Sequence, residues 1–504
     1  MVLLDGQSLA LEDVAAIADD DRPVGLAQAA RARVEAASAV VTRKAEGDEA
    51  VYGINTGFGS FADVRIPHDA LSALQLNLLR SHAAGVGEPL SRRAVRATMA
   101  LRANVLACGY SGVRASTLDA LIALLNARVH PVVPSRGSVG ASGDLAPLAH
   151  ISLVLVGEGA ANLDGVHLPG AEALRTAGLS PVALGPKEGL ALINGTQPSA
   201  ALLALALLDA ERLARAADVA AALSIDGLRG STRPFDARIH DARPFDGQRA
   251  SAANIARLLA GSPINASHAD CGRVQDAYSM RCAAQVHGAA RDALSFVRRT
   301  VAIESNAATD NPMVFADTGA IVSGGNFHGA PIAIAADLLV IALAQFATIS
   351  ERRSDRLLNP AFSGLPAFLT LDGGLQSGLM MAQVTAAALT SELKVLAHPA
   401  SVDTIPTSGN KEDHVSMSMA AALKAERAVV LARQVVAIEL LCAAQALDLI
   451  APLTTSVPLT RVHDTIRARV AMLARDRPLS PDIAAIDDLI ATGAIDHALD
   501  GVVN

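Results

Sequence analysis

The sequence predicts a mainly α-helical protein in which a smaller amino-terminal region is followed by a long helical bundle. Hydrophobic residues make up 51% of the 504 residues, yet aromatic residues make up only 3% and Trp is absent. The interior is therefore expected to consist of Ala, Leu, Val and Ile, which lets helices approach closely. The run 414–450 contains neither Gly nor Pro. As a helix rising 1.5 Å per residue it would be on the order of 50 Å long.

Helix-like runs follow one another along the chain. The amino-terminal part is expected to contain Leu26–Glu46, Leu71–His82, Ser91–Leu106 and Ser116–Arg128. The later part is expected to contain Ser199–Ile225, Ala283–Glu304, Ala330–Glu351, Ser377–Ala397 and His414–Ile450, with an irregular polar stretch up to residue 250. The long runs carry too few charges to stand alone in water, so we expect a bundle that also packs across subunits. The expected regions are 1–198, which carries the loops described below, and 199–504, which carries the bundle and the C-terminal helices.

The composition argues against several classes of protein. The net charge is −8 with both signs interspersed, which leaves no basic stripe for nucleic acid. Charges such as Asp209 and Asp337 interrupt the apolar runs, so these are expected to be buried helices and not membrane spans. The four cysteines form no CxxC pair, no signal peptide is evident, and no HExxH metal motif occurs. We therefore expect a cytoplasmic protein with reduced thiols and no metal.

The most informative stretch is the loop Val132–Leu145, which reads Val-Val-Pro-Ser-Arg-Gly-Ser-Val-Gly-Ala-Ser-Gly-Asp-Leu. Its three glycines make the backbone permissive, and a helix is expected to begin near Asp144. A phosphate-binding loop would need GxxxxGK[ST], but an acid follows the last glycine. The spacing of Gly140 and Gly143 also differs from the GxSxG of a hydrolase.

A third use fits Ala141, Ser142 and Gly143. The unhindered amide nitrogen of Gly143 can attack the carbonyl carbon of Ala141. Loss of water, including the hydroxyl of Ser142, then leaves a five-membered ring with an exocyclic methylene. Such a ring is an electrophile made from the backbone. Alone, the tripeptide would indicate an ordinary turn, so this interpretation depends on its surroundings.

Two other segments place polar side chains in suggestive patterns. Residues 51–59 contain three glycines and an Asn-Thr pair, which indicates a loop in which Tyr52 would be a half-buried anchor. Gln275, Tyr278 and Arg281 are spaced by three residues, so all three would project from one face of a helix. Arg281 alone would be interpreted as a salt-bridge partner, although a planar guanidinium also suits a carboxylate ligand.

The stretch Gly-Ser-Val-Gly-Ala-Ser-Gly-Asp-Leu-Ala-Pro-Leu-Ala-His at 137–150 resembles the signature of the histidine and aromatic amino-acid ammonia-lyases. The resemblance covers nearly the whole chain. It implies that Ala141, Ser142 and Gly143 form an autocatalytic methylidene-imidazolone (MIO) group, with no metal or diffusible cofactor. It also implies a fumarase/aspartase-like helical architecture and a homotetramer whose active sites draw residues from three subunits. The implied reaction is elimination of ammonia from L-histidine to give urocanate.

The resemblance assigns roles to individual residues as well. Tyr52 matches the family base that takes the β-proton of the substrate, and because an unperturbed phenol titrates at about 10, this role needs a lowered pKa. Arg281 would bind the substrate carboxylate. The other matches border the ring or the carboxylate, and they are Tyr278 as a second catalytic candidate, Gln275, Asn194 and Phe327.

Three positions bear on the choice of substrate. His82 lies in an Arg-Ser-His segment, and Glu412 in Asn-Lys-Glu-Asp-His, where the histidine enzymes carry the same two residues. A carboxylate accepts the imidazole N–H of histidine, whereas beside a phenyl ring it would be a buried charge without a partner. Met380 also fits the histidine-type pocket. Lys411 departs from the family pattern, and it would either pair with Glu412 or face solvent.

The residues leave alternatives open. The chain could act on tyrosine, phenylalanine or a histidine analogue, or it could be an MIO-dependent aminomutase that returns ammonia to the β-carbon. A catalytically silent scaffold is a third alternative, against which the joint presence of Tyr52, the tripeptide and Arg281 argues.

Overall fold

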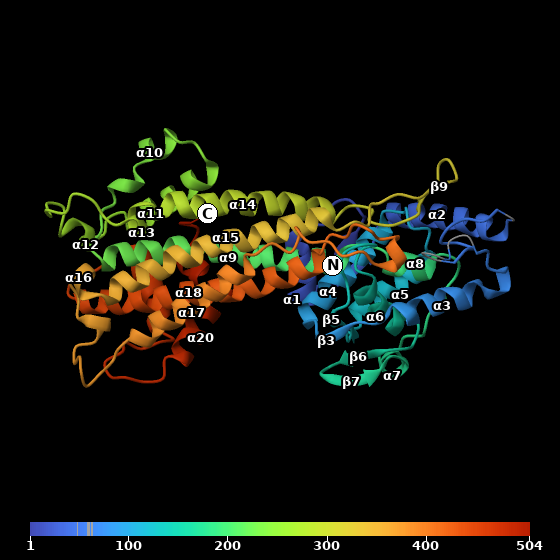
Figure 1. Cartoon of the computed structure of the whole chain (residues 1–504). Coiled ribbons are helices and arrows are strands. Elements are labelled where there is room, and N and C mark those ends of the chain that lie inside the picture. Colours follow the sequence, from blue (N-terminus) through green and yellow to red (C-terminus); the bar gives the residue numbers. More distant parts are fainter. Residues whose placement is uncertain (48, 58–60, 62–63, 504) are drawn as a thin grey trace. The chain divides into compact units, whose positions relative to one another are not determined.

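The chain is mostly helical, which confirms the predicted fold class (Figure 1). The computed structural model describes residues 1–47, 49–57, 61 and 64–503. It divides into two compact units: the first comprises Met1–Leu205, Arg298–Asp337 and Pro399–Ala425, and the second comprises Ala206–Val297, Leu338–His398 and Glu426–Asn504. The sequence-based division into 1–198 and 199–504 follows chain order, whereas each unit collects three separate segments.

Most elements belong to one unit. The helices of the first unit are α1 (Leu11–Asp19), α2 (Gln28–Glu46), α3 (Leu71–His82), α4 (Arg92–Ala107), α5 (Ala115–Asn126), α6 (Leu145–Leu155), α7 (Gly170–Thr176) and α8 (Glu188–Ile193). Those of the second are α10 (Ala237–Asp241), α11 (Asp246–Leu259), α12 (Pro263–Ala266), α13 (Tyr278–Arg281), α16 (Pro360–Ser363), α17 (Met380–Leu396), α19 (Val457–Arg467), α20 (Ser480–Ala491) and α21 (Ala494–Leu499). Parts of α9 (Gln197–Gly227), α14 (Ala283–Glu304), α15 (Ala330–Leu358) and α18 (Ser418–Ile450) belong to each unit. Short 3-10 helices lie at His68–Ala70, Arg233–Phe235, Ala367–Leu369 and Ser408–Asn410.

The helix boundaries agree closely with the sequence expectations at α3 and α14, which match at both ends. Among the long helices, α15 and α18 differ most from expectation at one end. α15 continues to Leu358, and α18 begins only at Ser418 because Met417 adopts a left-handed backbone with φ of 58°. The stretch expected to be irregular up to residue 250 instead contains α10 and the start of α11.

Short strands, which the sequence did not predict, join the loops of the first unit. β1 (Val2–Leu4) pairs in parallel with β2 (Val24–Leu26), and β8 (Met313–Phe315) forms an antiparallel pair with β9 (Ala320–Val322). β6 (Ala160–Leu163) lies between β4 (His130–Pro131) and β7 (Val166–Pro169), and β3 (Val86–Pro89) pairs antiparallel with β5 (Pro134–Arg136). Strands of two to four residues are too short for a clear period-two pattern. The β3–β5 pair ties the segment after α3 to the approach of the glycine-rich loop.

Within the second unit, buried polar contacts join the long helices of the bundle. Ser224 of α9 and Arg353 of α15 both bond to Glu439 of α18, and Asp218 of α9 bonds to His287 of α14. The helices approach closely because small residues dominate their contacts. The buried alanines of α18 in this unit are Ala428, Ala432, Ala437, Ala443, Ala444 and Ala446.

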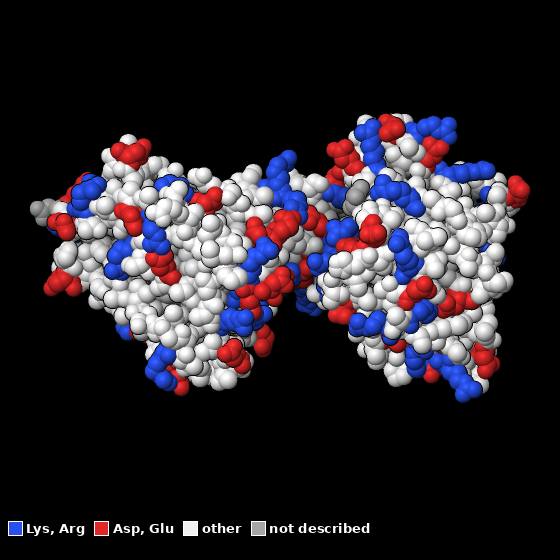
Figure 2. Space-filling view, turned by 180° about the vertical axis from the view of Figure 1, so that it is seen from behind, with Lys and Arg blue, Asp and Glu red and all other residues white. Residues whose placement is uncertain are grey.

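Two helices in the described ranges are long and apolar enough to cross a membrane by length and composition. They are α15 and α18, whose most apolar stretches have a mean hydropathy of 2.2 and 1.6. In these stretches 67% and 83% of the residues are buried inside the structure, as in core helices of a soluble protein. Figure 2 shows acidic and basic side chains intermingled over the visible face, in keeping with the charge pattern of the sequence.

Candidate active site

The loop around residues 137–144, in the first unit, makes a tight turn against the backbone of Gly195. Gly143 has a φ of +71°, and a Cβ added there would lie 2.3 Å from the carbonyl oxygen of Gly195. The same carbonyl accepts a 2.8 Å hydrogen bond from the amide of Asp144. Only glycine therefore fits at position 143.

The other end of the tripeptide is fixed through Gly140. Its carbonyl oxygen accepts a hydrogen bond of 2.8 Å from the Ser416 hydroxyl and one of 3.3 Å from the Gly329 amide. Ala141 is buried and packs with Val415 and Met417. Residues more than 180 positions away in sequence thus hold the loop before Ser142 in place.

Asp144 supports the loop from the protein interior. Its carboxylate is fully buried and accepts hydrogen bonds from the Ser138 hydroxyl at 2.6 Å and from the Ser199 amide at 2.9 Å. Burial raises the pKa of Asp144 although both hydrogen bonds oppose this. α6 begins directly after it, as expected, but the carboxylate does not cap that helix. The local sequence predicted only that a helix starts near Asp144. The signal for its second role, the support of the loop, was its position directly after the tripeptide.

Glu412 lies beside the tripeptide. One carboxylate oxygen accepts a 2.6 Å hydrogen bond from the Ser142 hydroxyl, and the other accepts bonds from Thr407 at 2.6 Å and Ser408 at 2.9 Å. Burial raises the pKa of Glu412, but the three hydroxyl donors and nearby His82 outweigh it, so the pKa is lowered. Glu412 is therefore ionised at neutral pH.

His82, at the end of α3, belongs to the same cluster because it interacts electrostatically with Glu412. Burial lowers the pKa of His82 against the opposing effects of the Leu78 carbonyl and Glu412. Its Nδ1 lies 2.9 Å from the carbonyl oxygen of Leu78, so Nδ1 carries the proton and Nε2 is left as an acceptor. Lys411 is exposed and forms no ion pair with a described residue, so its side chain faces solvent. The hydrogen-bond donors to Glu412 are therefore hydroxyl groups and not Lys411.

Three further predicted residues lie in the first unit. The amide nitrogen of Asn194 donates to the carbonyl of Asn311 at 2.9 Å, while its buried Oδ1 has no partner among the described atoms. Asn194 precedes Gly195, the residue against which the tripeptide turns. Phe327 is partly buried in the segment that reaches Gly140 through the amide of Gly329. Tyr52 is partly buried in a turn, as expected, and Phe58 and Gly59 of its loop lie outside the described residues.

The second unit holds the other four predicted residues. Tyr278 and Arg281 are the two ends of the four-residue helix α13, and Met380 begins α17. The expectation that Gln275 shares a helical face with them is wrong: Gln275 precedes the helix, whose boundary is set by the extended backbone of Ala277. Gln275 and Arg281 nevertheless line one cavity of about 510 Å³.

Arg281 has the character of an anion-binding residue. Its guanidinium lies over the Tyr278 ring, 4.7 Å from the centroid, and forms no ion pair with a residue in the described ranges. Its Nε is buried without a hydrogen-bond partner. An unpaired guanidinium that faces a cavity is suited to a carboxylate ligand. The described residues contain no group of three or more His, Cys, Asp or Glu placed to hold a metal ion.

The profile of the family described as "Aromatic amino acid lyase" matches residues 9–468. The chain belongs to the aromatic amino acid lyase family. Two curated members named "Histidine ammonia-lyase" are close in sequence. The one from Anaeromyxobacter sp. (strain K) is 57% identical over 98% of this chain and 99% of its own length. The one from Gloeobacter violaceus is 56% identical over 99% and 97%.

Solved structures of family members share the fold. The histidine ammonia-lyase from Trypanosoma cruzi superposes with a TM-score of 0.94 at 43% identity, covering 100% of this chain and 96% of that one. The tyrosine aminomutase from Streptomyces globisporus superposes with a TM-score of 0.95 at 36% identity, covering 100% and 99%. Fold likeness alone therefore does not separate a lyase from an aminomutase.

Proposed function

We propose that this chain eliminates ammonia from L-histidine and releases urocanate. The observation that carries the proposal is the cluster of Glu412, His82 and Ser142, in which an ionised carboxylate lies at the ring-forming tripeptide. Relatives at 57% and 56% identity over nearly their full length bear the histidine ammonia-lyase name. A carboxylate at this place favours a substrate with an N–H to donate over a phenyl or phenol ring.

The tripeptide 141–143 fits the formation of an MIO group. Gly143 has neither a side chain nor the space for one, and Gly140 and Asp144 are held from both sides. The group would supply an electrophilic methylene that makes the substrate amine a better leaving group. Departure of the Ser142 hydroxyl would remove the donor that occupies one oxygen of Glu412, and that oxygen then becomes free to accept the imidazole N–H.

The remaining residues would hold the substrate and move its proton. Arg281 would pair with the carboxylate through two N–H groups, with Gln275 and Asn194 as amide partners and Tyr278 stacked under the guanidinium. Tyr52 would take the β-proton. His82, neutral at pH 7 because burial lowers its pKa, would offer Nε2 to the imidazole side. Phe327 and Met380 would supply apolar walls.

We further propose a cytoplasmic homotetramer whose active sites combine residues of several subunits. Three large apolar side chains of α17 are exposed, and they are Met381, Val384 and Val395. Exposed apolar side chains of this kind are suited to contact with another subunit. Sedimentation should report a tetramer, and an active monomer would contradict this part of the proposal.

An aminomutase is the second candidate, because the tyrosine aminomutase superposes as well as the histidine ammonia-lyase from Trypanosoma cruzi does. Both reactions need the same ring, so the products decide. Purified protein should be incubated separately with L-histidine, L-tyrosine and L-phenylalanine while ultraviolet absorbance and free ammonia are followed. Urocanate and ammonia from histidine alone support the proposal. Accumulation of a β-amino acid, or product only from tyrosine or phenylalanine, contradicts it.

A further inference from the structure

A fully buried ion pair of the second unit lies next to α13, the helix that carries Tyr278 and Arg281. Arg353 of α15 and Glu439 of α18 are both 0% exposed, and their side chains meet through two hydrogen bonds of 2.5 and 2.8 Å. The hydroxyl of Ser224 donates to the same carboxylate at 2.7 Å. All of these residues lie within the helical bundle.

The guanidinium has a third bond that leaves the pair. Arg353 Nη1 donates to the main-chain carbonyl of Ser279 at 3.2 Å, and Ser279 lies between Tyr278 and Arg281. Within the described ranges, no other side chain forms a hydrogen bond to the backbone of α13. Met280, the next residue, is buried, while Tyr278 is 71% exposed. α13 is thus anchored at its centre and open toward the cavity.

α13 has only four residues and few internal hydrogen bonds, and a helix of this length is unstable by itself in water. Cys282 alone joins it to α14, so its carboxyl-terminal end is tied to a long helix, whereas the segment before Tyr278 is irregular. Side chains that must meet a substrate within a fraction of an ångström therefore depend on contacts from rigid neighbours. Two charges buried in a bundle gain little net stability compared with apolar residues of the same size, so stability alone gives a weak reason for the pair.

We propose that Arg353 is a positioning residue for the carboxylate-binding segment: the Arg353–Glu439 pair fixes the Ser279 carbonyl and thereby the direction of Arg281. The inference rests on the proposed role of Arg281 in binding the substrate carboxylate. Arg353 itself touches no substrate. A guanidinium is needed because two of its nitrogens, Nε and Nη2, bond to Glu439 while the third, Nη1, bonds to the carbonyl of Ser279.

The test is Arg353→Lys in the full-length protein. A lysine keeps the buried charge opposite Glu439 but lacks the fork that serves Glu439 and Ser279 together. We expect the KM for L-histidine to rise about tenfold with a smaller change in kcat. We also expect faster hydrogen exchange of backbone amides in 277–286, measured by mass spectrometry. An unchanged KM and unchanged exchange in this segment would overturn the inference, even if the melting temperature falls.

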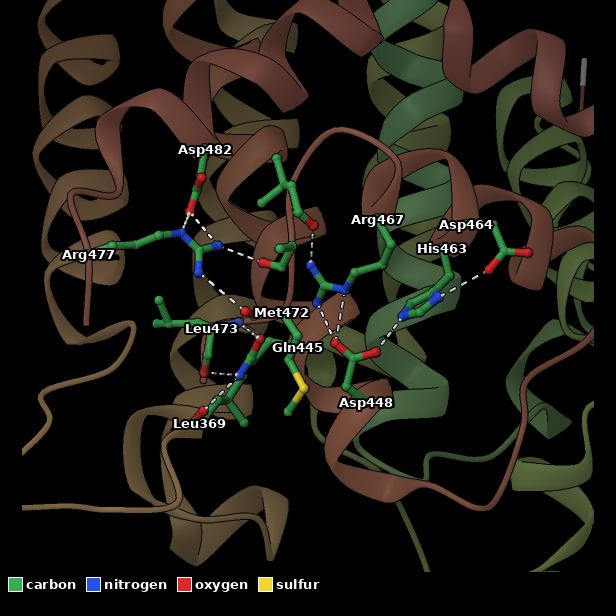
Figure 3. A network of polar contacts seen from close by, with 12 residues as sticks. Leu369, Gln445, Asp448, His463, Asp464, Arg467, Met472, Leu473, Arg477 and Asp482 are labelled. Atoms are coloured by element: carbon green, nitrogen blue, oxygen red, sulfur yellow. Dashed lines mark hydrogen bonds and ion pairs between the residues drawn. The ribbon is translucent and has the colours of Figure 1, made fainter. Parts of the chain in front are cut away.

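Arg467→Lys is the matched control. Arg467 also bonds at once to a carboxylate, that of Asp448 (Figure 3), and to the main-chain carbonyl of Val470. It touches none of the predicted site residues. Because Arg467 and Asp448 are 14% and 16% exposed, we expect this variant to lose less thermal stability than Arg353→Lys, while KM and exchange in 277–286 stay as in the parent. A KM rise equal to that of Arg353→Lys would attribute the effect to general destabilisation and would overturn the inference.

Two measures keep the test decisive. If Arg353→Lys does not fold, Ser224→Ala removes one donor to Glu439 without touching the arginine, and it should raise KM about twofold and speed exchange in 277–286. Unchanged values in that variant would overturn the inference. If the parent protein releases no ammonia from histidine, the proposed function fails. Hydrogen exchange in 277–286 then still decides whether Arg353 anchors α13.

Discussion

The ring-forming loop of the first unit and the α13 segment of the second are held in different ways. The loop is held by close packing of Gly143 against Gly195 and by hydrogen bonds from the Ser416 hydroxyl and the Gly329 amide to the carbonyl of Gly140. α13 receives one hydrogen bond from a guanidinium whose charge is balanced within the bundle, it buries Met280, and Cys282 alone separates it from α14. The backbone that we propose to react is thus held by glycine packing and by hydrogen bonds to its carbonyls. The side chain that we propose to bind the substrate lies on a segment that contacts a buried ion pair.

The largest expected effect comes from removing the hydroxyl that the loop would lose on the proposed ring formation. Ser142→Ala should leave a folded protein, because Ser142 contributes one side-chain hydrogen bond, to Glu412. Activity on L-histidine should fall by a factor on the order of 10,000. Mass spectrometry of the intact parent should show a chain lighter by the lost waters, and the variant should retain its full mass. A variant with undiminished turnover would refute the ring chemistry.

Gly143→Ala tests the backbone side of the comparison directly. The new Cβ would lie 2.3 Å from the carbonyl oxygen of Gly195, so the turn must open. Turnover should fall on the order of 1,000-fold, with the water loss blocked. Gly178→Ala is the matched control: its φ is also +71°, but nothing lies within 4 Å of the added Cβ. It should cost about 1 kcal/mol of stability and leave activity unchanged. Equal activity in the two variants would contradict the steric argument.

Arg281→Lys tests the binding side. Lysine keeps the positive charge but loses the two parallel N–H groups and the stacking on Tyr278. We expect KM for L-histidine to rise about 100-fold, with kcat affected less. Steady-state kinetics check this. A variant with the KM of the parent would place the carboxylate elsewhere.

Glu412→Gln tests the choice of substrate. The amide no longer offers a charged acceptor to the imidazole N–H, so kcat/KM for L-histidine should fall about 30-fold. The relative rate with L-phenylalanine should rise because the uncompensated charge is gone. A fall of the same size for both substrates would assign Glu412 to a step common to both. The parallel assay of the two amino acids separates these results.

The smallest expected effect is a pH dependence of stability in the first unit. Burial and the neighbouring Arg96 and Arg92 lower the pKa of His130 to about 4. Between the ordinary histidine pKa and 4 the unfolded chain therefore binds a proton that the folded chain does not, so stability falls as the pH falls through this window. Between pH 7 and pH 4.5 the free energy of unfolding should fall by about 2 kcal/mol more in the parent than in His130→Gln. Chemical denaturation at the two pH values measures this fall. Equal differences in the two proteins would show that His130 is not the group responsible.

The sequence alone predicted the features that depend on neighbouring residues in the chain. Apolar periodicity and the lack of glycine and proline define the long helices, and the predicted bounds of α3 and α14 match at both ends. The tripeptide 141–143, its glycine spacing and the family signature are also readable directly, since they lie within one short stretch.

Tertiary structure decided which distant residues meet. The hydrogen bond from Ser142 to Glu412 joins positions 270 residues apart, and the bond from Arg353 to Ser279 joins two segments of different helices. Spacing suggested a continuous helix from Gln275 to Arg281, yet the chain stays extended until Ala277. Periodicity reports only the neighbours along a helix. Burial, ion pairing and backbone strain depend on the partners that the folded chain brings from elsewhere in the sequence.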